Sequence, residues 1–254
     1  MQILGLTAKT MSRTLAEFVL IVLGVTVALA ADSWRETLLE RRLEESIINR
    51  LVDDFELQLE EFEEARREVT WAMAHGKAVL PYIDGNGNTE NPISVLVSAY
   101  QASRWHTTIE LVDHTYVEIF STGGLGLIAS PEIRAAVVNF YRLYEFGRPA
   151  DLRKRHNEAY YNLVRARIPF EIQQQIRFAM RDSGTNGCAL EDEPLQCKLE
   201  ADTDIVAEAF SDLVDPEIAY SLNLWMQSLV NEVELTGTYG DLASDVLRVI
   251  AENR

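Results

Sequence analysis

The feature that most constrains this chain is an apolar segment that runs without interruption into a long helical pattern. Residues 15–31 are apolar except for Glu17, Gly24 and Thr26, and residues 32–75 contain neither Pro nor Gly. The residues that break helices are therefore missing from the junction between the two parts. The sequence predicts one long helix that begins in a membrane and continues into water.

The membrane-spanning helix is expected at residues 14–34, after a short cytoplasmic leader at 1–13. At 1.5 Å per residue this segment covers about 31 Å, which matches a hydrocarbon core of about 30 Å. Glu17 then lies near one headgroup layer, where its side chain can snorkel, and Trp34 lies near the other. The predicted protein is held in the lipid by a single span.

A cleaved signal peptide is the alternative interpretation of this segment. Lys9 and Arg13 form a weakly basic start, and residues 28–30 (Ala-Leu-Ala) resemble a small-x-small cleavage site. The helical pattern continues through that site to Trp34 and beyond, so we expect a retained anchor.

Two cysteines bear on the compartment and the orientation. Cys188 and Cys197 lie in a segment rich in Gly, Pro and acids, which we expect to be a loop over 182–201. A disulfide between them would place the domain in an oxidising compartment, and free thiols are the alternative. Two Cys alone make an incomplete zinc site. Charges flanking the span are ambiguous, so the cysteines favour a periplasmic domain at a bacterial inner membrane.

The charge distribution excludes one class of partner. The formal net charge is −17, which argues against nucleic-acid binding because phosphates would be repelled. Residues 142–181 reverse the trend, with nine Lys or Arg against four acids. We expect this basic block to pack against the acidic first helix. A surface for anionic lipids or an acidic partner is the alternative.

An all-α helical bundle is expected at 35–254, because no segment shows the alternation of strands. It divides into a long acidic helix at 35–80, a helical core at 91–181, the Cys loop at 182–201 and C-terminal helices at 202–254. Pro81 and the turn residues 84–88 end the first helix. Capping residues and periodicity then predict helix starts at Asn91-Pro92, Thr107 or Thr108, Ser130-Pro131 and Asp215-Pro216, and helices over 149–167, 170–182, 202–214 and 241–252.

The long helix has one apolar face and one acidic face. Every seventh residue from 48 to 69 is large and apolar, and three of the four residues found four positions later are apolar too. We expect this face to pack within the chain, in a bundle, rather than against a sister subunit. The eight residues are Ile48, Val52, Phe55, Leu59, Phe62, Arg66, Val69 and Met73. The opposite, solvated face carries Glu56, Glu60, Glu61, Glu63, Glu64 and Glu68.

Two patterns resemble reactive or binding motifs. His106, Glu110 and His114 have the four-residue spacing of metal ligands on a helix, but Thr107 and Glu110 fit a capping box better. Residues 124–129 match G-x-G-x-x-A, which binds dinucleotides only between a strand and a helix; here a glycine turn between helices is expected. No nucleophile or metal motif is found. The chain is therefore predicted not to be an enzyme, and no catalytic residue, cofactor or metal is expected.

Two stretches resemble an uncharacterised bacterial family of single-span membrane proteins, the domain of unknown function numbered 6090. The first is residues 17–36, a glycine-containing span that ends in Trp34 and charged residues. The second is residues 115–141, which is similar to the family's helix–glycine turn–helix core and contains Gly123, Gly124 and Gly126. The resemblance covers residues 15–145 and implies a membrane-tethered helical protein without a known activity.

Two functions follow as hypotheses. The first is a membrane-anchored accessory or scaffold protein that contacts a membrane-protein partner, or a further copy of itself, through Glu17, Gly24 and Trp34, because a small residue permits close approach and a buried acid seeks a partner. The alternative is an extracytoplasmic ligand-sensing bundle that works with a separate transducer. Its pocket would be lined by Tyr116, Tyr141, Tyr160 and Trp225.

Overall fold

The structure is a computed structural model that describes residues 4–85, 87, 89–104, 111–146, 150–181 and 200–254. Within these residues every regular element is a helix, which confirms the predicted all-α class. The elements are α1 (Leu4–Ile83), α2 (Pro92–Ala102), α3 (His114–Ser121), the 3₁₀ helix η1 (Gly124–Leu127), α4 (Pro131–Phe146), α5 (Ala150–Arg167), α6 (Phe170–Arg181), α7 (Thr203–Leu213) and α8 (Pro216–Asn253).

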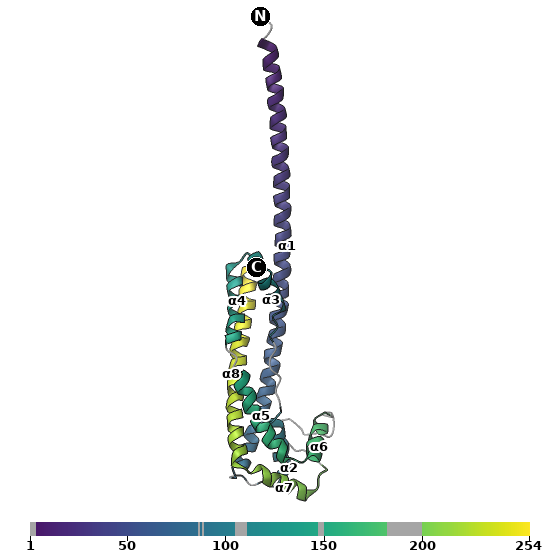
Figure 1. The fold of residues 1–254 in the computed structure, drawn as a ribbon, viewed down its shortest axis with the longest axis vertical. Helices are drawn as coiled ribbons and strands as arrows, with labels where there is room; N and C mark the ends of the chain where they lie inside the picture. Colours follow the sequence, from purple (N-terminus) through teal and green to yellow (C-terminus); the bar gives the residue numbers. More distant parts are fainter. Residues whose placement is uncertain (1–3, 86, 88, 105–110, 147–149, 182–199) are drawn as a thin grey trace.

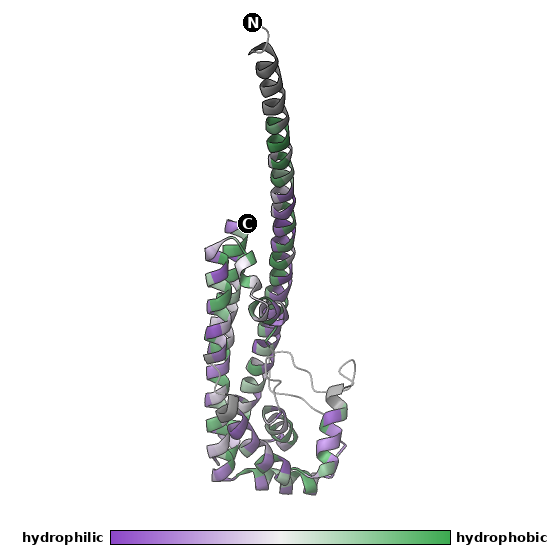
Figure 2. Ribbon diagram, turned by 45° about the horizontal axis from the view of Figure 1, so that its top comes forward, coloured by the Kyte–Doolittle hydropathy of each residue, from purple (hydrophilic) through white to green (hydrophobic). Residues whose placement is uncertain are grey.

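Helix α1 is the longest helix of the described chain and extends far beyond the bundle, whose other helices pack along its second half (Figure 1). One helix of the described chain is long and apolar enough to cross a membrane, and it is α1; none of its apolar window is buried inside the protein. Figure 2 shows the apolar residues of the projecting part giving way to polar ones before the bundle begins. The predicted continuation of an apolar N-terminal helix into the first helix of a bundle is confirmed.

One line of residues on α1 faces the bundle. Its positions alternate in steps of three and four, which keeps them on one side of the helix. The expected residues 48, 55, 62 and 69 lie on this line. Of the residues expected four positions later, Val52, Leu59 and Met73 are half-buried and pack against the cores, and Arg66 is exposed; the most buried positions follow three residues later. The line runs Ile48, Leu51, Phe55, Gln58, Phe62, Ala65, Val69, Ala72, Gly76, Val79 and Ile83.

The helices that pack against α1 determine which of its residues are most buried. Helices α8 and α2 pack against it within the same chain, and they cover the side that carries the small residues Ala65, Ala72 and Gly76. Small side chains let two helix backbones approach closely, so the large residues Val52 and Leu59 are left half-buried. Val52 and Leu59 therefore lie at the edge of the packed face, where they still contact the near core.

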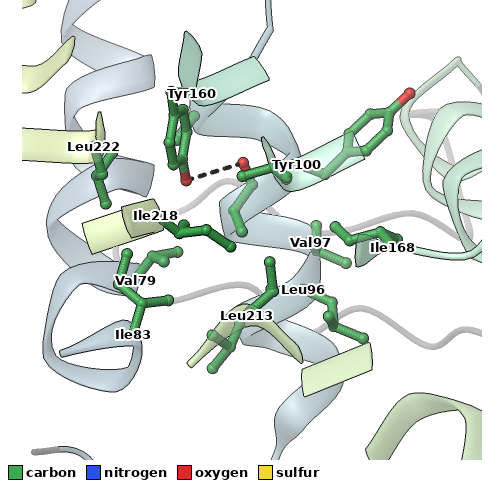
Figure 3. Packing of buried hydrophobic residues seen from close by; sticks show 14 of the residues in the cluster. Val79, Ile83, Leu96, Val97, Tyr100, Tyr160, Ile168, Leu213, Ile218 and Leu222 are labelled. Atoms are coloured by element: carbon green, nitrogen blue, oxygen red, sulfur yellow. Dashed lines mark hydrogen bonds between the residues drawn. The ribbon is translucent and has the colours of Figure 1, made fainter. Parts of the chain in front are cut away.

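Two hydrophobic cores are stacked along α1. The near core, on the side of the span, joins the α1 residues 47–62 to α4 and the second half of α8; its largest members include Phe55, Phe62, Phe140 and Tyr144. The far core joins the α1 residues 69–83 to α2, α5, α6, α7 and the first half of α8. Figure 3 shows the far core, where the buried Tyr160 hydroxyl donates a hydrogen bond to the Ala99 carbonyl at 3.4 Å.

Helix α8 is longer than expected. The sequence predicted a separate last helix at 241–252 capped by Asp241, but α8 runs without a break from Pro216 to Asn253. Asp215 caps it, since its Oδ1 accepts the backbone N–H of Glu217 at 2.7 Å. Gly237 and Gly240 lie inside the helix. Each costs about 1 kcal/mol relative to Ala, and the continuous buried face of α8 against α1 and α4 offsets that cost.

The first helix also ends later than expected. Pro81 lies inside the last turn of α1, which continues to Ile83, and Ile83 is buried in the far core. Gly85 then adopts the left-handed conformation, with φ of 72°, that terminates a helix. The glycine of the turn cluster, rather than Pro81, therefore ends α1.

The predicted packing of the basic block 142–181 on the acidic face of α1 is wrong. Helix α5 lies against α8, and Arg167 pairs with Asp215 at 3.0 Å. Arg165 stacks over the Tyr100 ring, 3.4 Å from its centroid. The six acids of α1 are exposed to solvent. Aromatic and helix-cap contacts of this block outweigh the long-range attraction between opposite charges, which water screens.

Replacing Phe140 by Ala tests the near core. Phe140 is 1% exposed and its ring meets Phe55 edge-on at 4.9 Å between centroids. We expect Phe140→Ala to lower the free energy of unfolding by about 3–5 kcal/mol, measured by chemical denaturation of the full chain in mild detergent. Phe120, which is 61% exposed, is the matched control and should cost less than about 0.5 kcal/mol. Equal losses would contradict the described core.

Candidate functional site

A long run of exposed apolar side chains lies on α1 before the bundle. Every residue from 18 to 43 is exposed, and we name residues 35–43 the stalk. The stalk carries Leu38, Leu39 and Leu43 among charged residues, and the last two are 54% and 48% exposed. Since α1 rises 1.5 Å per residue, the stalk separates Trp34 from the bundle by about 15 Å.

The predicted contact residues lie on this exposed part. A Cβ atom at Gly24 would meet no atom within 4 Å, so the helix surface there is open. Trp34 is 69% exposed. Glu17 belongs to α1, but its side chain lies outside the described part. Seven residues separate Glu17 from Gly24, which places both positions on the same side of the helix.

The bundle begins where polar side chains of α1 anchor the segment that leads into α3. Gln58 Oε1 accepts the backbone N–H of Val112 at 2.7 Å, and Asp54 Oδ2 accepts that of Thr115 at 3.0 Å. Asp54 thereby caps α3 from another helix, because Asp113 at its N-cap makes no side-chain cap bond. The expected helix from Thr107 or Thr108 is not continuous to Phe120: residues 111–113 are not helical and α3 begins at His114.

Two further residues of α1 hold the end of the bundle nearest the span. Arg50 pairs with Glu118 at 2.6 Å, and this contact lowers the pKa of the Glu118 carboxyl. Glu44 Oε1 accepts the backbone N–H of Ala129 at 2.6 Å. These anchors were not predicted from the sequence. Their signal was a series of polar residues, four to six positions apart, beside or within an otherwise apolar line.

The predicted glycine turn between helices is confirmed. Gly123 has a φ of 75°, a left-handed conformation that favours Gly, and Gly124 is buried against Ile119. The 3₁₀ helix η1 follows, and Ser130 then caps α4 by accepting the backbone N–H of Ile133 at 3.2 Å. A helix precedes these glycines, so they lack the strand that a dinucleotide site needs.

The remaining predicted ligands are not brought together in the described chain. Cys188 and Cys197 lie outside the described residues, and so do His106 and Glu110. His114 is the exposed first residue of α3. Among the residues that the structure describes, no group of three or more His, Cys, Asp or Glu could hold a metal ion.

The aromatic pocket predicted for a ligand does not form. Tyr160 and Trp225 are buried in the far core, whereas Tyr141 is buried in the near core with Tyr116 stacked on it at 4.1 Å. The Trp225 indole donates a hydrogen bond to the Ala102 carbonyl at 2.8 Å, and the Tyr141 hydroxyl donates one to the Val112 carbonyl at 2.8 Å. These polar groups serve the fold.

A serine and a histidine meet on the surface between α5 and α8. His156 Nδ1 lies 2.6 Å from Ser228 Oγ, which also bonds the Leu224 carbonyl at 3.2 Å. A nucleophilic serine needs an adjacent base that a third group orients. The described hydrogen bonds of His156 and Ser228 include no such group, and Ser228 lies within a regular helix. We assign the pair to helix packing.

A second histidine is buried where α1 meets α2. His75 is 5% exposed, its Nδ1 lies 3.4 Å from Ser98 Oγ, and the Trp71 ring meets it edge-on at 4.3 Å. Burial, assisted by the charge of Arg104, lowers the pKa of His75 to about 4. The imidazole is therefore neutral at physiological pH.

Comparison with known proteins returned no significant match to any family model, curated protein or solved structure. The resemblance to the single-span family stays a prediction.

The glycine turn supplies a matched pair of substitutions. Gly123→Ala forces an L-residue into a left-handed conformation and should lower the free energy of unfolding by about 1–2 kcal/mol. Gly126 is not among the glycines of positive φ, and a Cβ there meets nothing within 4 Å. Gly126→Ala should change stability by less than about 0.5 kcal/mol. Chemical denaturation compares the two, and a larger loss at Gly126 would contradict this turn.

His75 predicts a dependence of stability on pH. Below pH 6.5 the unfolded chain binds a proton that the folded chain excludes until about pH 4, so the free energy of unfolding falls as pH drops through this window. The fall attributable to His75 is about 2–3 kcal/mol between pH 7 and 4.5. Chemical denaturation of the wild type and of His75→Leu at both pH values isolates it, because the variant should lack this part of the loss. Equal losses in both proteins would exclude His75 as its source.

Proposed function

We propose that this chain is a single-pass protein of a bacterial inner membrane, with its bundle on the periplasmic side, and that it acts as an accessory or scaffold for another membrane protein. The observation that carries this proposal is the division of α1. One face of its second half packs into the two cores, whereas its first half exposes an apolar surface that nothing in the described chain covers.

Gly24 is the candidate for the closest contact in the membrane. Lipid tails are as apolar as the side chains of a span, so helices associate in a bilayer through close packing and polar contacts rather than the hydrophobic effect. A small residue supports such packing, and the surface at Gly24 is open. Glu17 would add a polar contact near the headgroups. Trp34 would fix the depth of the helix.

The bundle would hold a partner's extracytoplasmic region at a set height. The stalk is a continuous helix, so it places the bundle about 15 Å from Trp34 instead of letting it drift on a flexible linker. The acidic outer face of α1 and the net charge of −17 keep anionic surfaces away. The periplasmic assignment is supported by Cys188 and Cys197, whose pairing would require an oxidising compartment.

Recovery of membrane partners tests the proposal. The full chain is tagged at its C-terminus, extracted in mild detergent and captured, and co-purifying proteins are identified by mass spectrometry. Gly24→Leu and Glu17→Leu should each lower partner recovery several-fold, because the first fills the approach surface and the second removes a polar contact. Ala30→Leu is the matched control, since it enlarges a small residue about 120° away around the same helix. Unchanged recovery with both variants would contradict contact through this face.

A further inference from the structure

The stalk presents an apolar stripe on α1 before the first residues that the bundle buries. Leu39 and Leu43 form this stripe, and both are about half exposed. Ile48, which faces the near core, follows Leu39 by nine residues; at about 100° per residue this is half a turn around the helix. Leu43 lies closer to the bundle side, about 40° from Ile47, which is buried in the near core. Both leucines precede the first buried residue of α1, and they are open to another molecule for that reason.

The stripe has a basic edge and an acidic edge. Arg35 and Arg42 lie about 40–60° from Leu39 on one side, and Glu36 and Glu40 lie about 60–100° from it on the other. All four residues are exposed. Neither Arg35 nor Glu40 has an ion pair among the described residues. When two copies of this helix pair, their opposite charges can meet in only one of the two possible orientations, parallel or antiparallel.

In a parallel pair related by a twofold axis, the basic edge of each helix meets the acidic edge of the other. Arg35 and Glu40 are five residues apart on opposite edges, which is the spacing of the ion pairs between parallel helices. Arg35 then faces the partner's Glu40, and the same contact occurs a second time by symmetry. In an antiparallel pair, like edges meet and repel. Two copies anchored by N-terminal spans in one membrane are necessarily parallel.

We propose that the occupant of the Leu39–Leu43 stripe is a second copy of this chain, paired in parallel and in register. This inference rests on the proposed function, because it names a partner for the exposed first half of α1. The pairing is continuous with the span, where Phe18, Val22, Val25 and Leu29 follow the same alternation of three- and four-residue steps. The same side of α1 thus runs from the lipid to the top of the bundle and is apolar except at Asp32 and Glu36.

Charged residues limit the length and the strength of the pairing. Asp32 and Glu36 occupy two positions of the alternation. In the pair, each would lie opposite the same acidic residue of the second chain, and the two like charges would repel. The stalk therefore associates weakly without its span. Below the stalk, the outward side of α1 carries Asp53, Glu60 and Glu64, all exposed. Like charges there drive the two bundles apart. The dimer is held by the spans and stalks, with the bundles separated.

Charge exchange tests this pairing on the full chain. Two tagged forms are co-expressed, extracted in mild detergent and captured through one tag, and the second tag is quantified; light scattering gives the mass of the complex. Arg35→Glu and Glu40→Arg, each alone, replace two attractive contacts by two repulsive ones and should lower self-capture roughly tenfold. Co-expressing the Arg35→Glu chain with the Glu40→Arg chain restores opposite charges in both contacts and should restore capture.

Arg41→Glu is the matched control, because it makes the same change of charge about 160–200° from the stripe and should leave self-capture unchanged. A monomeric wild type, unaffected single variants or failure of the mixed pair to recover would each overturn the proposal. A monomeric wild type whose Arg35→Glu variant loses another membrane protein would assign the stripe to that protein. The proposed function would then stand, since its own test is partner recovery with Gly24→Leu.

Discussion

The line of α1 that alternates in steps of three and four is the constraint on which the rest of the structure depends. It contributes residues to both cores, and its small members, Ala72 and Gly76, let α8 approach closely. Helix α8 also contributes to both cores, whereas the other helices contribute to one core each, so α1 and α8 together join the cores. A change that tilts α1 against α8 would open both cores together, whereas damage to α5 or α6 would be confined to the far core.

Polar contacts decide where this apolar line ends. Near the span, Glu44 and Asp54 accept backbone N–H groups of other segments, and Arg50 pairs with Glu118. A backbone N–H without a partner is costly to bury, so these side chains permit the α3–η1 segment to cover the near core. Between Phe18 and Leu43 every described side chain of the helix is exposed, and the helix continues alone as the stalk. The boundary between enclosed and exposed helix is thus set by hydrogen bonding as well as by apolar area.

Local chemistry was predictable from the sequence and tertiary choices were not. The starts of α4 and α8 follow from caps within a few residues, and the left-handed Gly123 was expected as part of a glycine turn. The flank of α1 that packs depends on where α8 lies, and the start of α3 depends on Asp54, sixty residues earlier. Asp241 is a residue type that can begin a helix, but Tyr239 and Ala243 on either side of it are buried in the near core, and α8 continues past Asp241 without a break. Of the candidate site, the exposed span at Gly24 was predictable, whereas the stalk stripe required knowing which side of α1 the bundle covers.

The stiffness of α1 gives the exposed half its functional meaning. A tether that only kept the bundle near a membrane would work with a flexible Gly- and Ser-rich linker. Residues 32–75 instead contain no Pro or Gly, and the stalk is helical throughout. A rotation of the span about its axis is therefore passed to the bundle and is not absorbed by a linker. A partner that binds the Gly24 face or the Leu39–Leu43 stripe therefore also fixes the rotation of the bundle. It determines whether the acidic side at α1 or the basic side at α5 faces a neighbouring molecule.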